Sequence, residues 1–192
     1  MTPGDPHQSP PPSASPPEAS EQDLSARFEA LATEAVDPLR RYLARRTDSA
    51  TAEDVLSETL LVCWRRAGDI PADAAVAWAI GVARWCLANA ERAGRRRGLL
   101  ARRVASVDPP VQHLPGPGQS TPEQDAADHA AATVAAAMSR LNAKDAEVVR
   151  LWAWEQLTPT QIAVVLGTSV NAATVRLHRA KKKLRTHLEA VS

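Results

Sequence analysis

Apolar side chains recur at spacings of three and four along most of this 192-residue chain, and that spacing places them on one face of an α-helix. The clearest stripe lies near the C-terminus and comprises Val170, Ala173, Leu177, Ala180, Leu184 and Leu188. No segment of the sequence shows the alternation of apolar and polar residues that is typical of a half-buried strand. The pattern predicts an all-α protein.

The stretch 158–188 contains the signals of two helices joined by a tight turn. Thr158 and Gln161 form a Thr-x-x-Gln capping box around Pro159, which suits the first helical position because that position needs no amide hydrogen. Gly167 tolerates the left-handed conformation found just past a helix end. A short helix, a glycine-containing turn and a longer second helix with polar groups near its start are typical of a DNA-binding helix-turn-helix.

Six cationic side chains follow along the second of these helices. They are Arg176, Arg179, Lys181, Lys182, Lys183 and Arg185. A run of charge of this kind is often only a solvated helix face. Behind a capped helix-turn-helix we favour the other interpretation, in which these side chains neutralise DNA phosphates.

Composition divides the chain into four parts. Residues 1–22 are rich in proline and serine and have almost no large apolar side chains, so we expect them to be disordered. Residues 23–103 contain three helical stripes, and residues 121–192 contain about four. Between them, residues 104–120 are rich in proline and glycine, which prevent regular structure. We therefore expect two small helical domains joined by a flexible linker, with the helix-turn-helix in the C-terminal one.

Helix-start signals place the three N-terminal helices. The first begins near Asp23 and continues past Asp37 and Pro38, which we interpret as a cap and first position of a continuing helix that Leu39, Tyr42 and Leu43 extend. The second begins at a capping box formed by Thr51 and Asp54. The third covers about residues 72–97 and ends in a tail of arginines. Three apolar stripes of this kind can bury a core of their own.

The remaining composition indicates a protein of the cell interior without a cofactor. The N-terminus lacks the basic start and apolar core of a signal peptide. The longest uncharged apolar run, residues 74–83, is far shorter than the roughly 20 residues of a membrane-spanning helix. Cys63 and Cys86 show no metal-ligand spacing, so we expect free buried thiols. Scattered histidines and the lack of a phosphate loop or nucleophile elbow argue against an enzyme and against a metal site.

One face of the second helix allows two interpretations. Asp54, Glu58 and Leu61 lie on the same side of it, because residues three and four apart are neighbours on a helix. Carboxylates beside an exposed leucine suggest a docking surface for a protein partner. An ordinary solvated helix face explains the same residues, and this helix alone does not decide between the two.

Several short motifs, in this order, resemble two regions of one bacterial protein family. Those of the N-terminal half are Phe28-Glu29-Ala30-Leu31, Ala52-Glu53-Asp54-Val55, Glu58-Thr59, Trp64-Arg65, Ala77-Trp78 and Ala83-Arg84. Those of the C-terminal half are Leu166-Gly167, Val170, Arg176 to Ala180 and Leu184. The first set resembles region two, and the second resembles region four, of RNA polymerase sigma factors of the extracytoplasmic-function class.

This resemblance implies a dissociable transcription-initiation subunit of the cytoplasm, which gives RNA polymerase its promoter specificity. Catalysis then belongs to the polymerase. The implied partners are core RNA polymerase, contacted at the β′ clamp coiled coil and the β flap, promoter DNA, and an anti-sigma factor that holds the two domains inactive. Within the resemblance, Asp54, Glu58 and Leu61 face the clamp coiled coil.

The resemblance also implies two DNA-binding surfaces. The proximal promoter element is expected to contact the loop before the third helix and that helix itself, through Asp69, Ile70, Arg84, Asn89, Arg92, Arg95 and Arg96. The distal element is expected to contact the helix-turn-helix, through Asn171, Thr174, Val175, His178, Arg179 and Lys182. The family often has arginine or lysine in place of Thr174 and serine in place of Val175. We therefore expect methyl contacts with thymine, and DNA shape, to carry more of the specificity here.

Two questions stay open on the sequence. Trp64 and Trp78 lie on apolar stripes and are predicted to be core residues. Trp85 stands where the family usually has asparagine, and it could stack on a base, pack internally or face the polymerase. The alternative function is a conventional helix-turn-helix regulator that binds DNA as a dimer without polymerase. Such a regulator has no need of the acidic second helix or of the arginine-tailed third helix.

Overall fold

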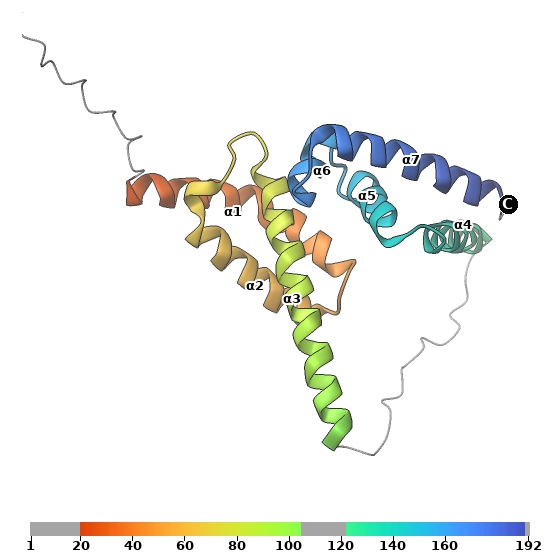
Figure 1. Ribbon diagram of the computed structural model, residues 1–192, viewed down its shortest axis with the longest axis horizontal. Coiled ribbons are helices and arrows are strands. Elements are labelled where there is room, and N and C mark those ends of the chain that lie inside the picture. The colour runs from red at the N-terminus through yellow and green to blue at the C-terminus, as the bar shows by residue number, and fades with distance from the viewer. Residues whose placement is uncertain (1–19, 105–121, 191–192) are drawn as a thin grey trace, which may run out of the picture.

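The computed structural model describes residues 20–104 and 122–190, and both parts are helical (Figure 1). The first part contains α1 (Glu21–Ala44), α2 (Ser49–Arg65), the 3-10 turn η1 (Ala67–Asp69) and α3 (Ala75–Val104). The second contains α4 (Pro122–Ser139), α5 (Ala143–Ala153), α6 (Pro159–Leu166) and α7 (Val170–Glu189). Neither described range contains a strand, so the predicted all-α class is confirmed. The tail predicted over 1–22 and the linker predicted over 104–120 lie almost entirely outside the described residues.

The turn between α6 and α7 follows the predicted signals. Thr158 Oγ1 accepts a hydrogen bond from the Gln161 amide at 3.3 Å, and Gln161 Oε1 accepts one from the Thr158 amide at 2.9 Å. The capping box is therefore confirmed, with Pro159 at the first helical position. At the other end of α6, Gly167 has a φ of 59°, which is the left-handed conformation that glycine adopts without steric cost.

The start of α2 differs from the prediction. The helix begins at Ser49 and is capped by Asp48, whose Oδ1 accepts a hydrogen bond from the Thr51 amide at 3.0 Å. This bond and the one from the Thr51 hydroxyl hold the pKa of Asp48 below its ordinary value. The predicted capping box of Thr51 and Asp54 is therefore wrong, because an equally good cap lies three residues earlier.

The first helix continues past Pro38, as predicted. α1 runs without a break from Glu21 to Ala44, so Pro38 lies inside the helix, and the predicted cap at Asp37 is wrong. A proline at such a position removes one backbone hydrogen bond. The neighbouring Leu39, Tyr42 and Leu43 are fully buried, and we attribute the continuity of α1 to this packing.

The N-terminal helices α1, α2 and α3 pack pairwise around a common core. Its largest fully buried side chains are Leu31, Leu39, Tyr42, Leu43, Val55, Thr59, Cys63, Ile80 and Cys86. The hydroxyl of Thr59, which lies deep among them, donates to the carbonyl of Val55 at 2.7 Å. This polar group is therefore satisfied within its own helix, as a buried hydroxyl requires.

In the C-terminal half, α7 packs against α5 and α6, and more lightly against α4. Val148, Leu151 and Ile162 are fully buried in this part. A smaller apolar cluster under α4 comprises Leu141, Ala146, Val149 and Ala180. α7 is therefore held along its length by three other helices.

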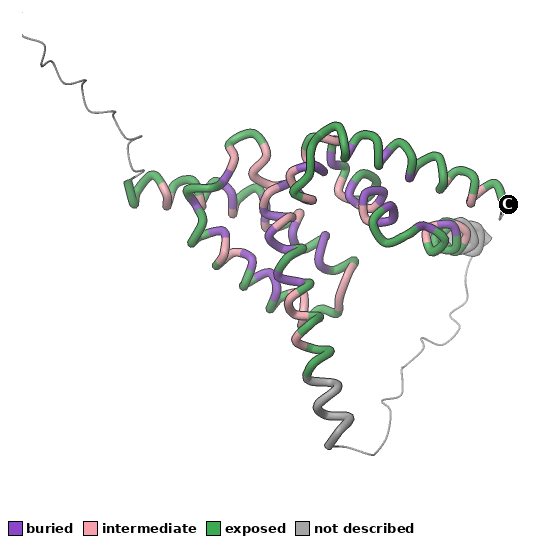
Figure 2. The backbone as a smooth tube through the Cα atoms, in the orientation of Figure 1, coloured by how far each residue is buried: buried purple, intermediate pink, exposed green. Residues whose placement is uncertain are grey.

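The two halves are packed against each other through α3 and α6. One continuous apolar cluster extends from α1–α3 into α5, α6 and α7, and Figure 2 shows buried segments in all of these helices. The contact is close at Gly81, where an added Cβ atom would lie 3.3 Å from the carbonyl oxygen and 3.4 Å from the Cα of Val165. Glycine at this position lets the α6 backbone approach α3.

Candidate nucleic-acid interface

The residues of α7 that are predicted to read the distal element are exposed to solvent. Its buried stripe of Ala173, Leu177 and Ala180 faces the rest of the domain. At its start, Ser169 Oγ accepts a hydrogen bond from the Ala172 amide at 3.2 Å and caps the helix. All six predicted residues are exposed: Asn171, Thr174, Val175, His178, Arg179 and Lys182. The structure therefore leaves this helix free to enter a groove of DNA.

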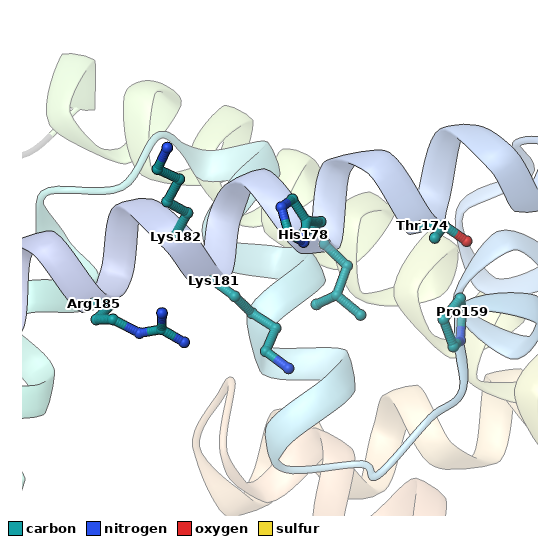
Figure 3. A pocket seen from close by; sticks show the side chains of 7 residues that line it. Pro159, Thr174, His178, Lys181, Lys182 and Arg185 are labelled. Atoms are coloured by element: carbon teal, nitrogen blue, oxygen red, sulfur yellow. The ribbon is translucent and has the colours of Figure 1, made fainter.

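A hollow of about 410 Å³ lies beside α7, between this helix and the first residue of α6 (Figure 3). Its lining comprises Pro159, Thr174, Leu177, His178, Lys181, Lys182 and Arg185. Pro159 and Thr174 lie at one end, and Arg185 lies at the other. Cationic side chains beside a helix start are suited to the phosphates of a DNA strand, which fix the register of a DNA-binding helix.

Two of the α7 lysines are engaged inside the domain. Lys183 Nζ lies 2.7 Å from Oδ2 of Asp145, which is 7% exposed in the first turn of α5. The hydrogen bond from Lys183 lowers the pKa of Asp145. Lys181 Nζ lies 3.9 Å from the ring centroid of Trp152, in a cation–π contact. The cationic run predicted to contact phosphates is thus partly used to hold α7 on α5.

The hydroxyl of Thr174 is engaged within its own helix. The hydroxyl donates to the carbonyl of Val170 at 2.8 Å, so its hydrogen is used within α7. Val170 is 47% exposed and Val175 is 39% exposed on the same helix. The start of α7 therefore offers methyl groups to solvent, which is the chemistry that contacts a thymine methyl in the major groove.

The acidic face of α2 is exposed as predicted, with Asp54, Glu58 and Leu61 on it. Leu61 is 47% exposed, so this face presents a large apolar side chain to solvent. Asp54 and Glu58 line one wall of a hollow of about 810 Å³, and Asn89, Arg92 and Arg96 of α3 line the other. The structure thus brings the predicted polymerase-binding and proximal-element residues to the two sides of one hollow.

The arginines of α3 are exposed but mostly have neighbours of their own. Arg84 lies 4.0 Å from Glu147 of α5, and Arg95 lies 3.8 Å from Glu91. Arg92 donates a short hydrogen bond to Asn89 Oδ1. These side chains are available at the surface, but each must leave or share a partner to hold a DNA strand.

The loop before α3 corrects one predicted site residue. Ile70 is 5% exposed and belongs to the N-terminal core, so its side chain is a support of the loop and not a DNA contact. Its carbonyl accepts a hydrogen bond from Arg27 Nη2 at 2.6 Å, which ties the loop to α1. Asp69 is exposed and pairs with Arg66 at 2.9 Å. An apolar side chain in a short loop is hard to place from sequence, because no periodicity indicates which way it points.

The helices that carry these surfaces match known proteins. The family model described as Sigma-70, region 4 matches residues 132–184, which include α5, α6 and most of α7. The ECF RNA polymerase sigma factor SigL of Mycobacterium tuberculosis is 34% identical over 169 residues, covering 86% of this chain and 90% of that protein. The chain belongs to the ECF RNA polymerase sigma factors. The resemblance seen in the sequence motifs is thereby confirmed, and with it the role in transcription initiation.

A solved structure shares the fold of this sigma factor. CnrH, in complex with the cytosolic domain of CnrY, matches with a TM-score of 0.53 and 21% sequence identity. The match covers 91% of this chain and 100% of CnrH. At this identity the likeness concerns the fold alone, and it extends over the helices of both halves.

The tryptophans of the sigma factor correct another prediction. Trp64 is 47% exposed and makes an edge contact with Phe28, with ring centroids 5.2 Å apart, so it is not a core residue. Trp78 is partly buried against the core, beneath the guanidinium of Arg66. Trp85 of α3 is 55% exposed and lines a hollow between α3 and the C-terminal half. Helical spacing placed Trp64 at the edge of the apolar stripe, where a large ring reaches solvent.

Cys63 and Cys86 are both free and fully buried. Burial raises the pKa of Cys63 to about 12 and also raises that of Cys86. In the described ranges, no three histidine, cysteine or acidic side chains gather in a way that could hold a metal ion. None of the described helices has the length and apolar character needed to cross a membrane.

The ion pairs of three carboxylates were not predicted from the sequence. Asp145, Glu147 and Glu155 each face cations from another helix or from the other half of the protein. Their partners lie far away in the chain, so no local spacing indicates the pairing.

Proposed function

We propose that this sigma factor docks on core RNA polymerase with the acidic face of α2 and reads two promoter elements, the proximal one with α3 and the distal one with α7. The observation that supports this division best is the separation of exposed charge between the helices. Asp54 and Glu58 give α2 a face that repels phosphates and suits a protein partner. Arg179 and Lys182 give α7 a face that attracts phosphates.

The α2 face has the composition of a protein-binding surface. Leu61 supplies an exposed apolar centre, and Asp54 and Glu58 lie beside it as charged neighbours. A basic coiled coil, such as the β′ clamp of core polymerase, complements this arrangement. The C-terminal half then contacts the β flap, and the chemistry of RNA synthesis stays with the polymerase in the cytoplasm.

For the distal element, we propose that the start of α7 lies in the major groove. Asn171, His178 and Arg179 offer hydrogen-bonding groups to base edges, while Thr174 and Val175 offer methyl groups to thymine. Lys182 then lies further along the helix and contacts a phosphate.

For the proximal element, we propose that α3 holds a separated DNA strand along its exposed arginines. The residues involved are Asp69, Arg84, Asn89, Arg92, Arg95 and Arg96. Cations that follow a strand backbone are typical of single-strand binding, and a neighbouring loop can accept an unstacked base. Ile70 supports this loop from the core.

Run-off transcription with purified core polymerase and a promoter library tests the function. The docking surface is tested separately by a pull-down of core polymerase with Asp54→Ala, Glu58→Ala and the double variant. The double variant should bind roughly tenfold more weakly, or about 1.4 kcal/mol. Glu53→Ala is the matched control, because Glu53 is an exposed neighbour that faces Arg40 of α1 at 3.8 Å.

Unchanged affinity of the double variant would remove α2 as the docking surface. A chain that binds promoter DNA tightly by itself and never directs initiation would instead support a regulator that works without polymerase. That alternative leaves the exposed face with Leu61 and its carboxylates without a role.

We also propose an anti-sigma partner for this protein. CnrH, which shares its fold, is solved with the cytosolic domain of CnrY. Two halves that meet along one seam offer such a partner a place to hold them together or to come between them. A pull-down with the product of a neighbouring reading frame, followed by inhibition of run-off transcription, tests this expectation.

A further inference from the structure

Two exposed tryptophans at the end of α5 are not used by the proposed function. Trp152 is 39% exposed, and Trp154, the C-cap residue of α5, is 44% exposed. A cation lies over each ring. Cζ of Arg150, from α5 itself, lies 5.9 Å from the ring centroid of Trp154, whereas Nζ of Lys181 lies 3.9 Å from that of Trp152. Through Lys181, the ring of Trp152 is in contact with α7, the helix proposed to read the distal element.

Lys181 also lines the hollow beside α7. The lining contains three further side chains that can carry positive charge, those of His178, Lys182 and Arg185, and, within the described part of the chain, no carboxylate. In Figure 3 the Lys181 side chain extends away from α7, between those of Arg185 and Pro159. A cationic hollow without acidic side chains suits a phosphate of the DNA backbone.

The contact with Trp152 leaves the ammonium of Lys181 able to bind a second group. Attraction between a cation and the face of a ring uses no conventional hydrogen bond, so the N–H donors that point away from the ring stay available. Among the described residues, the Lys181 ammonium forms no hydrogen bond or ion pair. Lys183 differs, because its Nζ donates to Asp145 at 2.7 Å. Lys181 is therefore held in place and still free to donate.

Holding a lysine in place strengthens phosphate binding, because its side chain is long and rich in rotamers. A solvated lysine loses much of its side-chain entropy when a phosphate fixes it. A lysine that already lies on a ring has lost part of this entropy before the DNA arrives, so it binds more tightly. The contact adds little to the hold of α7 on α5, since both side chains are exposed and exposed cation–π pairs are weak.

We infer that Trp152 is a positioning residue for DNA binding. Its ring holds Lys181 at the hollow beside α7, where the ammonium contacts one backbone phosphate of the distal element. Because a phosphate carries no base identity, this contact strengthens binding to every duplex alike and helps to fix the register of α7. The inference rests on the proposed function of α7.

Substitutions of Trp152 separate the aromatic face from simple packing. Trp152→Phe keeps an aromatic ring, whereas Trp152→Leu keeps apolar bulk without one. We expect Trp152→Leu to weaken binding of the full chain to a short duplex of scrambled sequence roughly threefold, and Trp152→Phe to restore most of that loss. Fluorescence anisotropy of a labelled duplex measures both affinities. Equal affinities of the two variants would overturn the inference, because packing alone would then explain the residue.

Trp154→Leu is the matched control for the loss of an exposed tryptophan. Trp154 lies at the same end of α5, but its ring lies under Arg150 of that helix and not under a cation of α7. This variant should bind the duplex as wild type does. If Trp154→Leu and Trp152→Leu weaken binding alike, the effect belongs to α5 as a whole, and the role assigned to Trp152 is wrong.

A double-mutant cycle tests whether Trp152 acts through Lys181. Lys181→Met keeps the length of the side chain and removes its charge, so it should lower the slope of log affinity against log salt by about 1. In the Lys181→Met background, Trp152→Leu should have no further effect on affinity. A further threefold loss there would overturn the inference, since Trp152 would then contact DNA itself or support α7.

Chemical denaturation of each variant shows whether it remains folded. Should Trp152→Leu fail to fold, Lys181→Met still decides the matter, because an unchanged salt slope in that variant would overturn the phosphate contact. Arg179→Ala distinguishes this inference from the proposed function. If Arg179→Ala weakens DNA binding and the Trp152 variants do not, only the inference about Trp152 fails. If none of these variants changes DNA binding, the proposed function of α7 fails.

Discussion

α3 and α7 are both cationic helices of this sigma factor, yet their cationic side chains differ in whether they have acidic neighbours. On α3, Arg84 faces Glu147 of the other half, and Arg95 faces Glu91. On α7, Arg179 and Lys182 are exposed and form no ion pair with the described residues. The helix proposed to read the distal element therefore has unpaired cations, whereas two arginines of the helix proposed to hold the proximal element have carboxylate neighbours. A cationic helix in a sequence does not by itself indicate an available DNA surface.

The same contrast exists inside α7. Lys182 is exposed beside the hollow of Figure 3, while the next residue, Lys183, is bonded to the buried Asp145. Neighbouring residues on a helix point in directions about 100° apart, so adjacent lysines can have unrelated roles. Three variants can break or sharpen this distinction between engaged and free cations.

The largest effect is expected from Lys183→Met, which keeps the length of the side chain and removes its charge. The buried carboxylate of Asp145 then loses its partner, so the free energy of unfolding should fall by about 2–3 kcal/mol. This is less than for a fully buried pair, because the Lys183 side chain is 53% exposed. Chemical denaturation measures it, with Lys182→Met as the matched control that should change stability by no more than about 0.5 kcal/mol.

The pH dependence of the same variant gives an independent check. Because the folded-state pKa of Asp145 is lowered, its pair stabilises the fold fully above the ordinary aspartate pKa of about 3.9. That stabilisation is lost as the pH falls through the lowered pKa. The difference between wild type and Lys183→Met should therefore be constant from about pH 5 to 8 and shrink only in stronger acid. A difference that already shrinks near neutral pH would contradict the assignment to this pair.

A smaller effect is expected from Arg179→Ala, which removes a free cation near the start of α7. If Arg179 reads a base, binding to the distal element should weaken on the order of 1–2 kcal/mol, with little change on scrambled DNA. Competition binding with the two DNAs measures this ratio. An equal loss on every sequence would make Arg179 a phosphate contact.

The smallest effect is expected from Lys182→Ala. As a phosphate contact, Lys182 should contribute equally on all sequences, and its removal should reduce the slope of log affinity against log salt by about 1. Lys183→Met should leave this slope unchanged, because Lys183 is engaged with Asp145. If both variants change the slope alike, the distinction between engaged and free lysines on α7 is wrong.

The helices and their ends could be predicted because their signals are local. The capping box joins Thr158 to Gln161, and the amide of Gly167 bonds to the carbonyls of Ala163 and Val164, so each signal lies within four positions. The stripe through Ala173, Leu177 and Ala180 follows from the period of the helix. The start of α2 was misplaced only because two cap signals lie three residues apart, and local sequence does not rank them.

The family also followed from the sequence, through the order of its motifs. What the sequence by itself determined is therefore the all-α class, the helix-turn-helix and the family, while the two DNA-reading surfaces that the family implies stay predictions. Only the tertiary structure decided which of these side chains are free. Ile70 is buried and Trp64 is exposed, because the position of a neighbouring helix decides the surroundings of both.

The pairing of charges shows the physical reason most clearly. Lys183 and Asp145 are 38 residues apart, and Arg46 and Glu155 are 109 residues apart. Such pairs form only when whole helices have packed, and packing is driven by apolar area that carries no information about which carboxylate a cation will meet. The composition of each surface was in the sequence, but the closed seam between the halves was decided by the folded structure alone.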